Sequence, residues 1–160
     1  MRNGCLLLLL AFAGLTTARA QTPAAFALPH GLRLTVRGHA AVITDAKGGV
    51  VARNNRLIRQ AEDRTDCPAD GFRTVVVKGN FFTIEQQNCG GWFFINEYVT
   101  FKYVPASGRI QLHKFGQTFI DRRDPNADMP NQVLTEKQFG QLTFGLVDLE
   151  ALYALPAPTK

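Results

Sequence analysis

The 160-residue sequence has none of the short motifs that mark the common enzyme classes. It contains no Gly-x-Ser-x-Gly, no His-Glu-x-x-His, no phosphate-binding loop and no dinucleotide fingerprint. Its three histidines, His30, His39 and His113, lie far apart in the chain. The sequence therefore predicts no catalytic residues, no metal site and no cofactor.

Concentrated charge of one sign is also missing. Of eighteen Lys and Arg residues, Arg2 and Arg19 fall in the first twenty positions, which leaves sixteen against thirteen acidic residues, a net charge of +3. The most charged segment, residues 53–67, mixes both signs, as is typical of a solvated face; a partner-facing patch is the alternative. A nucleic-acid-binding domain needs a basic stripe, so we expect no nucleic-acid partner.

No apolar run is long enough to cross a membrane as a helix, which takes about twenty residues. The longest run, residues 5–15, follows Arg2 and precedes an Ala-x-Ala site that ends at Ala20. This order is typical of a secretory signal peptide cleaved after Ala20. We expect the remaining chain to be periplasmic or secreted, without a transmembrane segment.

We therefore divide the chain into four parts. Residues 1–20 are the expected signal peptide, and residues 21–30 are an Ala/Pro-rich, flexible tail. Residues 31–155 are expected to form a single β-rich domain. Residues 156–160 are expected to form a C-terminal tail.

Cysteine is scarce, and only Cys67 and Cys89 lie outside the expected signal peptide. In an oxidising compartment such a pair favours one disulfide. The alternative is a redox or nucleophilic thiol, but the sequence has no Cys-x-x-Cys and nothing that orients a histidine toward either sulfur. The sequence predicts a Cys67–Cys89 disulfide.

Aromatic and β-branched residues are abundant between positions 72 and 115. Turn-forming residues divide this segment into four strand-like runs. They predict a four-strand antiparallel meander: residues 72–78, 81–87, 92–104 and 109–115.

Further strands are expected at residues 32–37, 40–44 and 50–53, a short one at 117–120, and a strand or buried segment at 142–147. Thr135 and Gln138 form a capping-box pattern at the start of a short helix, and a second is expected within 148–155. The predicted fold class is mainly β, or α+β with minor helix, with an antiparallel meander sheet of about six to eight strands and one disulfide. A sandwich, a small barrel and a helix-covered sheet remain alternatives.

Alternation along residues 92–104 separates two faces. The expected core face carries Phe93, Ile95, Glu97, Val99, Phe101 and Tyr103. Glu97 is the exception on it, and a bulge, a sheet edge, an ion pair with a neighbouring Arg or Lys, or a functional carboxylate would each explain it. Trp92 and Tyr98 lie on the other face and are the first candidates for a binding surface.

A hydrolase is the alternative function. It would use Glu85 or Glu97 with His113, the one histidine on a predicted meander strand. Side-chain alternation shows which face of its own strand each residue occupies, but it does not show that residues on separate strands lie close together. The three aspartates Asp121, Asp124 and Asp128 lack the spacing of a calcium-binding loop and indicate a surface loop.

The segment VKGNFFTIEQQNCGGWFFINEYVTFKY, continued by LHKFG, resembles small exported bacterial proteins of no assigned activity. The resemblance covers roughly residues 72–116 and implies a β-rich fold and export. It brings no catalytic residues. We expect a non-catalytic binding protein whose partner is a protein or a cell-envelope ligand; an inhibitor or immunity-type protein is one version. Trp92, Tyr98, Glu97 and His113 are its candidate binding residues.

Overall fold

A computed structural model describes residues 23–61, 67 and 70–156 of the chain. The expected signal peptide, residues 1–20, lies outside the described residues. Of the expected tails, positions 21–22 and 157–160 also lie outside them.

The described strands form two antiparallel sheets, in which each strand pairs with its neighbours in the sequence. The first sheet contains β1 (Ala24–Ala27), β2 (Arg33–Arg37), β3 (Ala40–Thr44) and β4 (Val50–Asn54). The second contains β5 (Gly71–Lys78), β6 (Phe81–Gly90), β7 (Phe93–Val104), β8 (Arg109–Asp121) and β9 (Gln132–Thr135). The mainly-β fold class is confirmed, with more strands in the described residues than the six to eight expected.

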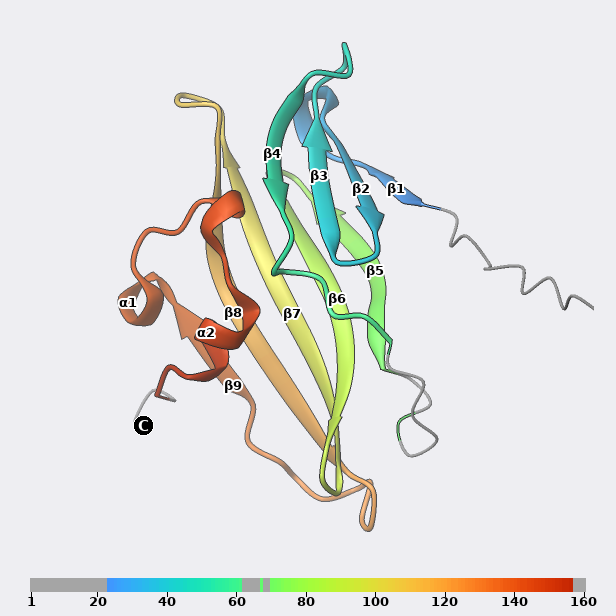
Figure 1. The fold of residues 1–160 in the computed structure, drawn as a ribbon. Helices are drawn as coiled ribbons and strands as arrows, with labels where there is room; N and C mark the ends of the chain where they lie inside the picture. Colours follow the sequence, from blue (N-terminus) through green and yellow to red (C-terminus); the bar gives the residue numbers. More distant parts are fainter. Residues whose placement is uncertain (1–22, 62–66, 68–69, 157–160) are drawn as a thin grey trace, which may run out of the picture.

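One face of the second sheet, which we call the inner face, is covered by the first sheet and by the C-terminal helices (Figure 1). Phe82 and Phe101 stack there with ring centroids 5.2 Å apart, and Phe144 packs at a tilt against Phe101 with centroids 5.0 Å apart. Leu34 and Ile43 of the first sheet belong to the same core. The arrangement is a sandwich in which short helices complete one layer.

The N-terminal segment differs from the flexible tail that its composition predicts. Residues 24–27 form β1, which pairs with β2 from Ala24 opposite Val36 to Ala27 opposite Arg33. Phe26 packs edge-on against Phe72 of the second sheet, with ring centroids 5.8 Å apart. Backbone pairing and one aromatic contact thus give structure to a segment whose Ala-rich sequence carries no alternating pattern.

The meander is confirmed, but two of its strands are longer than predicted. Strand β6 continues through Asn88 and Cys89 to Gly90, and the turn falls at Gly91–Trp92, where Gly91 has a φ of +57°. Strand β8 continues through Gly116 to Asp121, so the short strand expected at 117–120 is its second half. Pairing with β7 on one side and β9 on the other keeps Gly116 within the ladder.

The C-terminal segment adds three short helical elements. The predicted capping box is present at α1 (Glu136–Phe139), where the backbone N–H of Thr135 donates to Gln138 Oε1 at 2.9 Å. The 3₁₀ helix η2 (Phe144–Leu146) buries Phe144 but leaves Leu146 62% exposed, so residues 142–147 form neither the strand nor the fully buried segment that the sequence predicts. The terminal helix α2 (Leu149–Tyr153) is confirmed.

Asn54, at the end of β4, connects the first sheet to this C-terminal segment. Its side-chain amide donates to the carbonyl oxygens of Phe144 at 2.6 Å and Val147 at 2.7 Å. Asn54 is buried, so these bonds satisfy a polar group inside the core. The C-terminal segment therefore depends on the first sheet as well as on the second.

Residues 55–61 contain no helix. The mixed charge of this region predicts a solvated segment, but only part of it is exposed to solvent. Leu57 and Ile58 are buried, and Arg59 is only partly exposed. Residues 62–66, which carry most of the remaining charge, lie outside the described residues. The predicted disulfide between Cys67 and Cys89 is confirmed, with Cα atoms 5.7 Å apart.

Candidate functional site

Glu97 lies on β7 between Gln86 of β6 and Gln117 of β8, and its exposed fraction is 0%. The alternation that placed it on the core face is confirmed. A carboxylate in this position needs hydrogen-bonding or charged partners, because burying it alone costs many kcal/mol.

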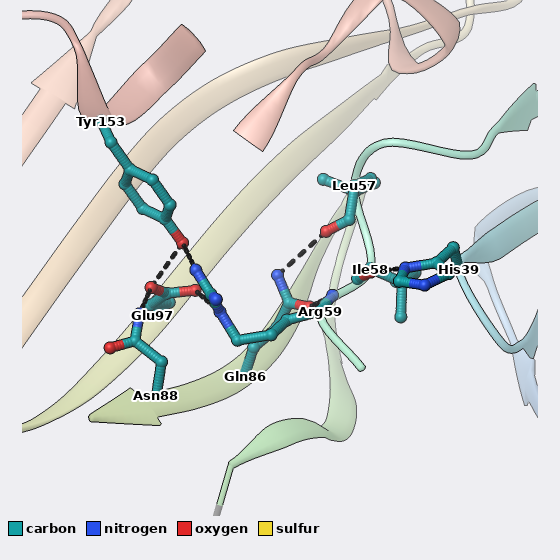
Figure 2. A network of polar contacts seen from close by, with 8 residues as sticks. All are labelled: His39, Leu57, Ile58, Arg59, Gln86, Asn88, Glu97 and Tyr153. Carbon is teal, nitrogen blue, oxygen red and sulfur yellow. Dashed lines mark hydrogen bonds and ion pairs between the residues drawn. The ribbon is translucent and has the colours of Figure 1, made fainter. Parts of the chain in front are cut away.

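Three side chains supply those partners (Figure 2). The hydroxyl of Tyr153 on α2 donates to Glu97 Oε1 at 2.5 Å, and the side-chain amide of Asn88 donates to the same oxygen. Arg59 Nε lies 3.5 Å from Glu97 Oε2, close enough for an ion pair. The geometry of that pair forms no hydrogen bond, so Arg59 Nε and Glu97 Oε2 are both buried without a hydrogen-bond partner.

Arg59 extends this network to three parts of the fold. Its Nη2 donates to the Tyr153 hydroxyl at 2.5 Å, and its backbone N–H donates to Gln86 Oε1 at 2.6 Å. Gln86 in turn donates to the carbonyl oxygen of Leu57 at 3.0 Å. Figure 2 shows these side chains converging from the 55–61 segment, the sheet and α2.

A bulge, a sheet edge, an ion pair or a functional role could each explain a carboxylate on the core face, and the structure shows the ion pair, with Arg59. The prediction of Glu97 as a binding residue is not supported, because an enclosed side chain has no contact with solvent or ligand. Sequence patterns did not identify its partners: Tyr153 lies 56 positions from Glu97 and 94 from Arg59.

The environment shifts the pKa values of all three ionisable groups. Burial raises the pKa of Glu97, and the Tyr153 hydrogen bond and the Arg59 charge offset only part of that effect. Burial would lower the pKa of Arg59, but the Glu97 charge and the Tyr153 hydrogen bond raise it above its ordinary value. Burial, together with the Glu97 charge, raises the pKa of Tyr153, which keeps its hydroxyl protonated as a donor.

The raised pKa of Glu97 predicts a specific pH dependence of stability. In an unfolded chain the pKa of a glutamate is about 4.3. Because the folded pKa is higher, the contribution of Glu97 to stability is complete when the pH lies below that value and is lost as the pH rises through the folded pKa. The free energy of unfolding of the parent, relative to Glu97→Gln, should therefore fall from about pH 4 toward neutrality. Urea unfolding of both proteins across this range is the measurement, and parallel profiles would contradict it.

The other residues of the hydrolase alternative do not converge with Glu97. Glu85 pairs with Tyr98, on the face of the second sheet opposite to the inner face. We call this opposite face the outer face. His113 is exposed on β8 and its ring lies 4.9 Å from that of Phe81, also on the outer face. Among the described residues no hydrogen bond joins His113 to Glu85 or Glu97.

Among the described residues, Trp92 is the most exposed aromatic side chain, with an exposed fraction of 60%. It occupies the β6–β7 turn at the end of the second sheet. The guanidinium of Arg123 lies 5.8 Å from its ring centroid, and that of Arg122 lies 5.1 Å from the ring of Phe94. Arg123 also makes a salt bridge of 2.7 Å with Asp121. Cation–π contacts of this kind hold arginine and aromatic side chains together at a surface.

The rest of the outer face is mostly polar at its centre, and exposed apolar side chains lie on its edge strands and at its end: Val76, Val133 and Ile120. Tyr98 is half-buried at its centre, between Glu85 and Gly116. Hydroxyl and amide groups meet across neighbouring strands: Thr83 Oγ1 lies 3.0 Å from Thr100 Oγ1, and Asn96 donates to Thr118 Oγ1 at 3.2 Å. Trp92, Tyr98 and His113 therefore lie on the outer face of the second sheet, whereas Glu97 lies on the inner face.

A cleft of ≈ 590 Å³ lies beside the Glu97 network, where the 55–61 segment meets the start of α2. Its lining includes His39, Arg56 and Asp148. Arg56 and Asp148 already form a salt bridge of 3.1 Å, and His39 Nδ1 lies 3.2 Å from the carbonyl oxygen of Ile58. These contacts tie the 55–61 segment to the start of α2 and to His39 in the β2–β3 turn.

In the part of the chain that the structure describes, no helix is long and apolar enough to cross a membrane. Within the same residues, no three His, Cys, Asp or Glu side chains gather closely enough to hold a metal ion. Comparison of the chain with protein-family models, with curated proteins and with solved structures gave no match.

Proposed function

We propose that this chain is an exported, non-catalytic binding protein whose contact surface is the outer face of the second sheet, with Trp92 at its end. The observation that carries the proposal is the exposure of this face. Within the described residues, the first sheet and the helices pack on the inner face. The outer face is contacted at one end by Arg122 and Arg123, over the rings of Phe94 and Trp92, and by Cys67 through its disulfide with Cys89.

The composition of the surface supports binding rather than catalysis. Trp, Tyr and Arg are the residues most enriched in the small set that dominates binding energy at protein surfaces. Trp92, Tyr98, Arg122 and Arg123 bring all three types to one side of the molecule. Tyr98 and Trp92 project from the sheet and from its β6–β7 turn, whose backbone is held by cross-strand pairing. Arg122 follows β8, and its backbone N–H donates to the carbonyl oxygen of Trp92 at 2.8 Å, so little ordering is needed when a partner binds.

Export is supported by the disulfide and by the signal-peptide pattern. Disulfides persist in oxidising compartments and are rare in the cytosol of most organisms. We therefore place the mature chain in the periplasm or the medium, where its partner would be a protein or a cell-envelope ligand. An inhibitor or immunity-type protein acting on an exported hydrolase is one form of this function. The Glu/His hydrolase has no support from the geometry, because Glu97 is enclosed and, among the described residues, no hydrogen bond joins His113 to Glu85.

Substitution of Trp92 tests the proposal. The oxidised mature protein, immobilised, is exposed to the periplasmic and secreted fraction of its source, and the retained molecules are identified by mass spectrometry. Trp92→Ala should weaken retention by about tenfold or more, as expected when an exposed aromatic contact that contributes at least about 1.4 kcal/mol is removed. Val50→Ala is the matched control, because Val50 is 64% exposed on β4 of the first sheet.

The proposal requires that binding depends on the outer face. Retention unchanged in both Trp92→Ala and Tyr98→Ala, with folding confirmed by circular dichroism, would remove this face as the binding surface. Equal loss in Val50→Ala would show that exposed apolar side chains act nonspecifically.

A further inference from the structure

The charges of the outer face are mostly of one sign. Cross-strand register assigns residues to this face, because directly opposite residues in a sheet share a face. Lys78 pairs with Phe81, which pairs with Lys102, and Lys114 pairs with Thr100. The face carries five exposed cations: Lys78, Lys102, Arg109, Lys114 and Arg122. Glu85 is the acidic residue that the same register places there.

Aromatic rings paired with cations lie at both ends of the face. At one end the Lys102 ammonium is 5.8 Å from the Phe81 ring centroid, and at the other Arg122 is 5.1 Å from that of Phe94. Phe94 and Lys102 are eight residues apart on β7, which corresponds to about 26 Å of extended strand. The spacing suits a ligand that is extended along the strands.

The centre of the face provides hydrogen-bonding groups, and its exposed apolar side chains, Val76, Val133 and Ile120, lie on the edge strands and at the end of β8. The side chains of the centre include Thr83, Gln87, Asn96, Tyr98 and Thr118. A protein partner usually buries an apolar centre that is depleted of charge. Hydroxyl and amide groups in the centre, with aromatic rings at the ends, match a ligand that has many hydroxyls and a ring that can stack on an aromatic face.

We propose that the outer face binds an acidic polysaccharide that runs along the strands of the second sheet. The cations bind its acidic groups, the threonine and amide side chains bind its hydroxyls, and the sugar rings stack on Phe81 and Phe94. This inference rests on the proposed binding function and names the chemical class of its ligand.

Binding of the oxidised mature protein to four defined polymers tests the proposal. Polygalacturonate and dextran sulfate provide carboxylate and sulfate as the acidic group, neutral dextran has the same backbone as dextran sulfate, and poly-glutamate is an acidic polymer without sugars. Isothermal titration at about 150 mM salt, where the Debye length is about 8 Å, limits long-range attraction. We expect at least one acidic polysaccharide to bind about tenfold or more tightly than both dextran and poly-glutamate.

Paired variants locate the site. Lys102→Gln combined with Lys114→Gln should weaken polysaccharide binding by about tenfold, since two exposed charge pairs together contribute on that order. Arg37→Gln combined with Lys47→Gln removes two exposed cations from the first sheet and its β3–β4 loop, and should bind like the parent. Phe81→Ala tests the stacking contribution separately from charge.

Failure to bind either acidic polysaccharide would overturn the inference, and so would equally tight binding of poly-glutamate, which would indicate an acidic protein partner. Equal weakening in the Arg37/Lys47 variant would also overturn it, because attraction would then follow net charge alone. In each case a Trp92-dependent partner recovered from the source fraction would leave the proposed binding function standing.

Discussion

Replacing Glu97 with alanine is expected to lower the free energy of unfolding by about 3–5 kcal/mol, the loss typical of removing one partner of a buried ion pair. The Tyr153 hydroxyl and the Asn88 amide would lose their acceptor. Arg59, whose side chain is only partly exposed, would lose its counter-charge. The substitution therefore leaves Arg59 without its counter-charge and two polar donors without their acceptor, although Arg59 still donates to the Tyr153 hydroxyl.

Urea unfolding, monitored by tryptophan fluorescence or circular dichroism, measures this loss. Glu85→Ala is the matched control, because it removes a carboxylate from the adjacent strand on the outer face and should change stability by no more than about 1 kcal/mol. Glu97→Gln keeps an oxygen acceptor for Tyr153 and Asn88, so its loss should be smaller than that of Glu97→Ala. If Glu97→Ala and Glu85→Ala proved equally stable, the network would not contribute to the fold as described.

Loss of the Cys67–Cys89 disulfide should lower the free energy of unfolding by about 3 kcal/mol, the value expected from loop entropy for a bridge with a sequence separation of 22. The bridge attaches the chain before β5 to the end of β6, so the unfolded chain without it gains freedom over this whole segment. The comparison is urea unfolding of the parent and of the double variant Cys67→Ala with Cys89→Ala.

Two controls accompany the disulfide experiment. A reducing agent should destabilise the parent and leave the double variant unchanged. The intact mass of the mature parent, after alkylation without reductant, should show no free thiol. Quantitative alkylation of both cysteines would mean that the disulfide does not form in the protein as isolated.

Much of the second sheet could be predicted from the sequence because its signals are local. Alternation in residues 92–104 identified the inner face and the burial of Glu97, and Pro105 to Gly108 marked the β7–β8 turn. The ends of β6 and β8 were missed because Asn88 to Gly91 and Gly116 resemble strand breaks. Pairing with strands on both sides outweighs the low strand propensity of such residues, and pairing is not visible in a single segment.

The partners of Glu97 could not be predicted, because each lies on another element. Arg59 belongs to a segment of mixed charge, which in most proteins is solvated, and only the packing of Leu57 and Ile58 beneath the first sheet brings it to the interior. Tyr153 lies on a helix of five residues whose sequence gives no indication of its position in space. The sequence supports an embedded carboxylate and an exposed Trp92, and the structure adds what each one contacts.

The contacts of Asn54 and Tyr153 also indicate an order for folding. Asn54 binds carbonyl oxygens of Phe144 and Val147, and Tyr153 joins Arg59 to Glu97, so these contacts join residues 56 to 94 positions apart in the chain. Strands β5 to β8 each pair with a neighbour in the sequence. Because closing a longer loop costs more conformational entropy, we expect these strands to pair first and the cover of their inner face to form afterwards.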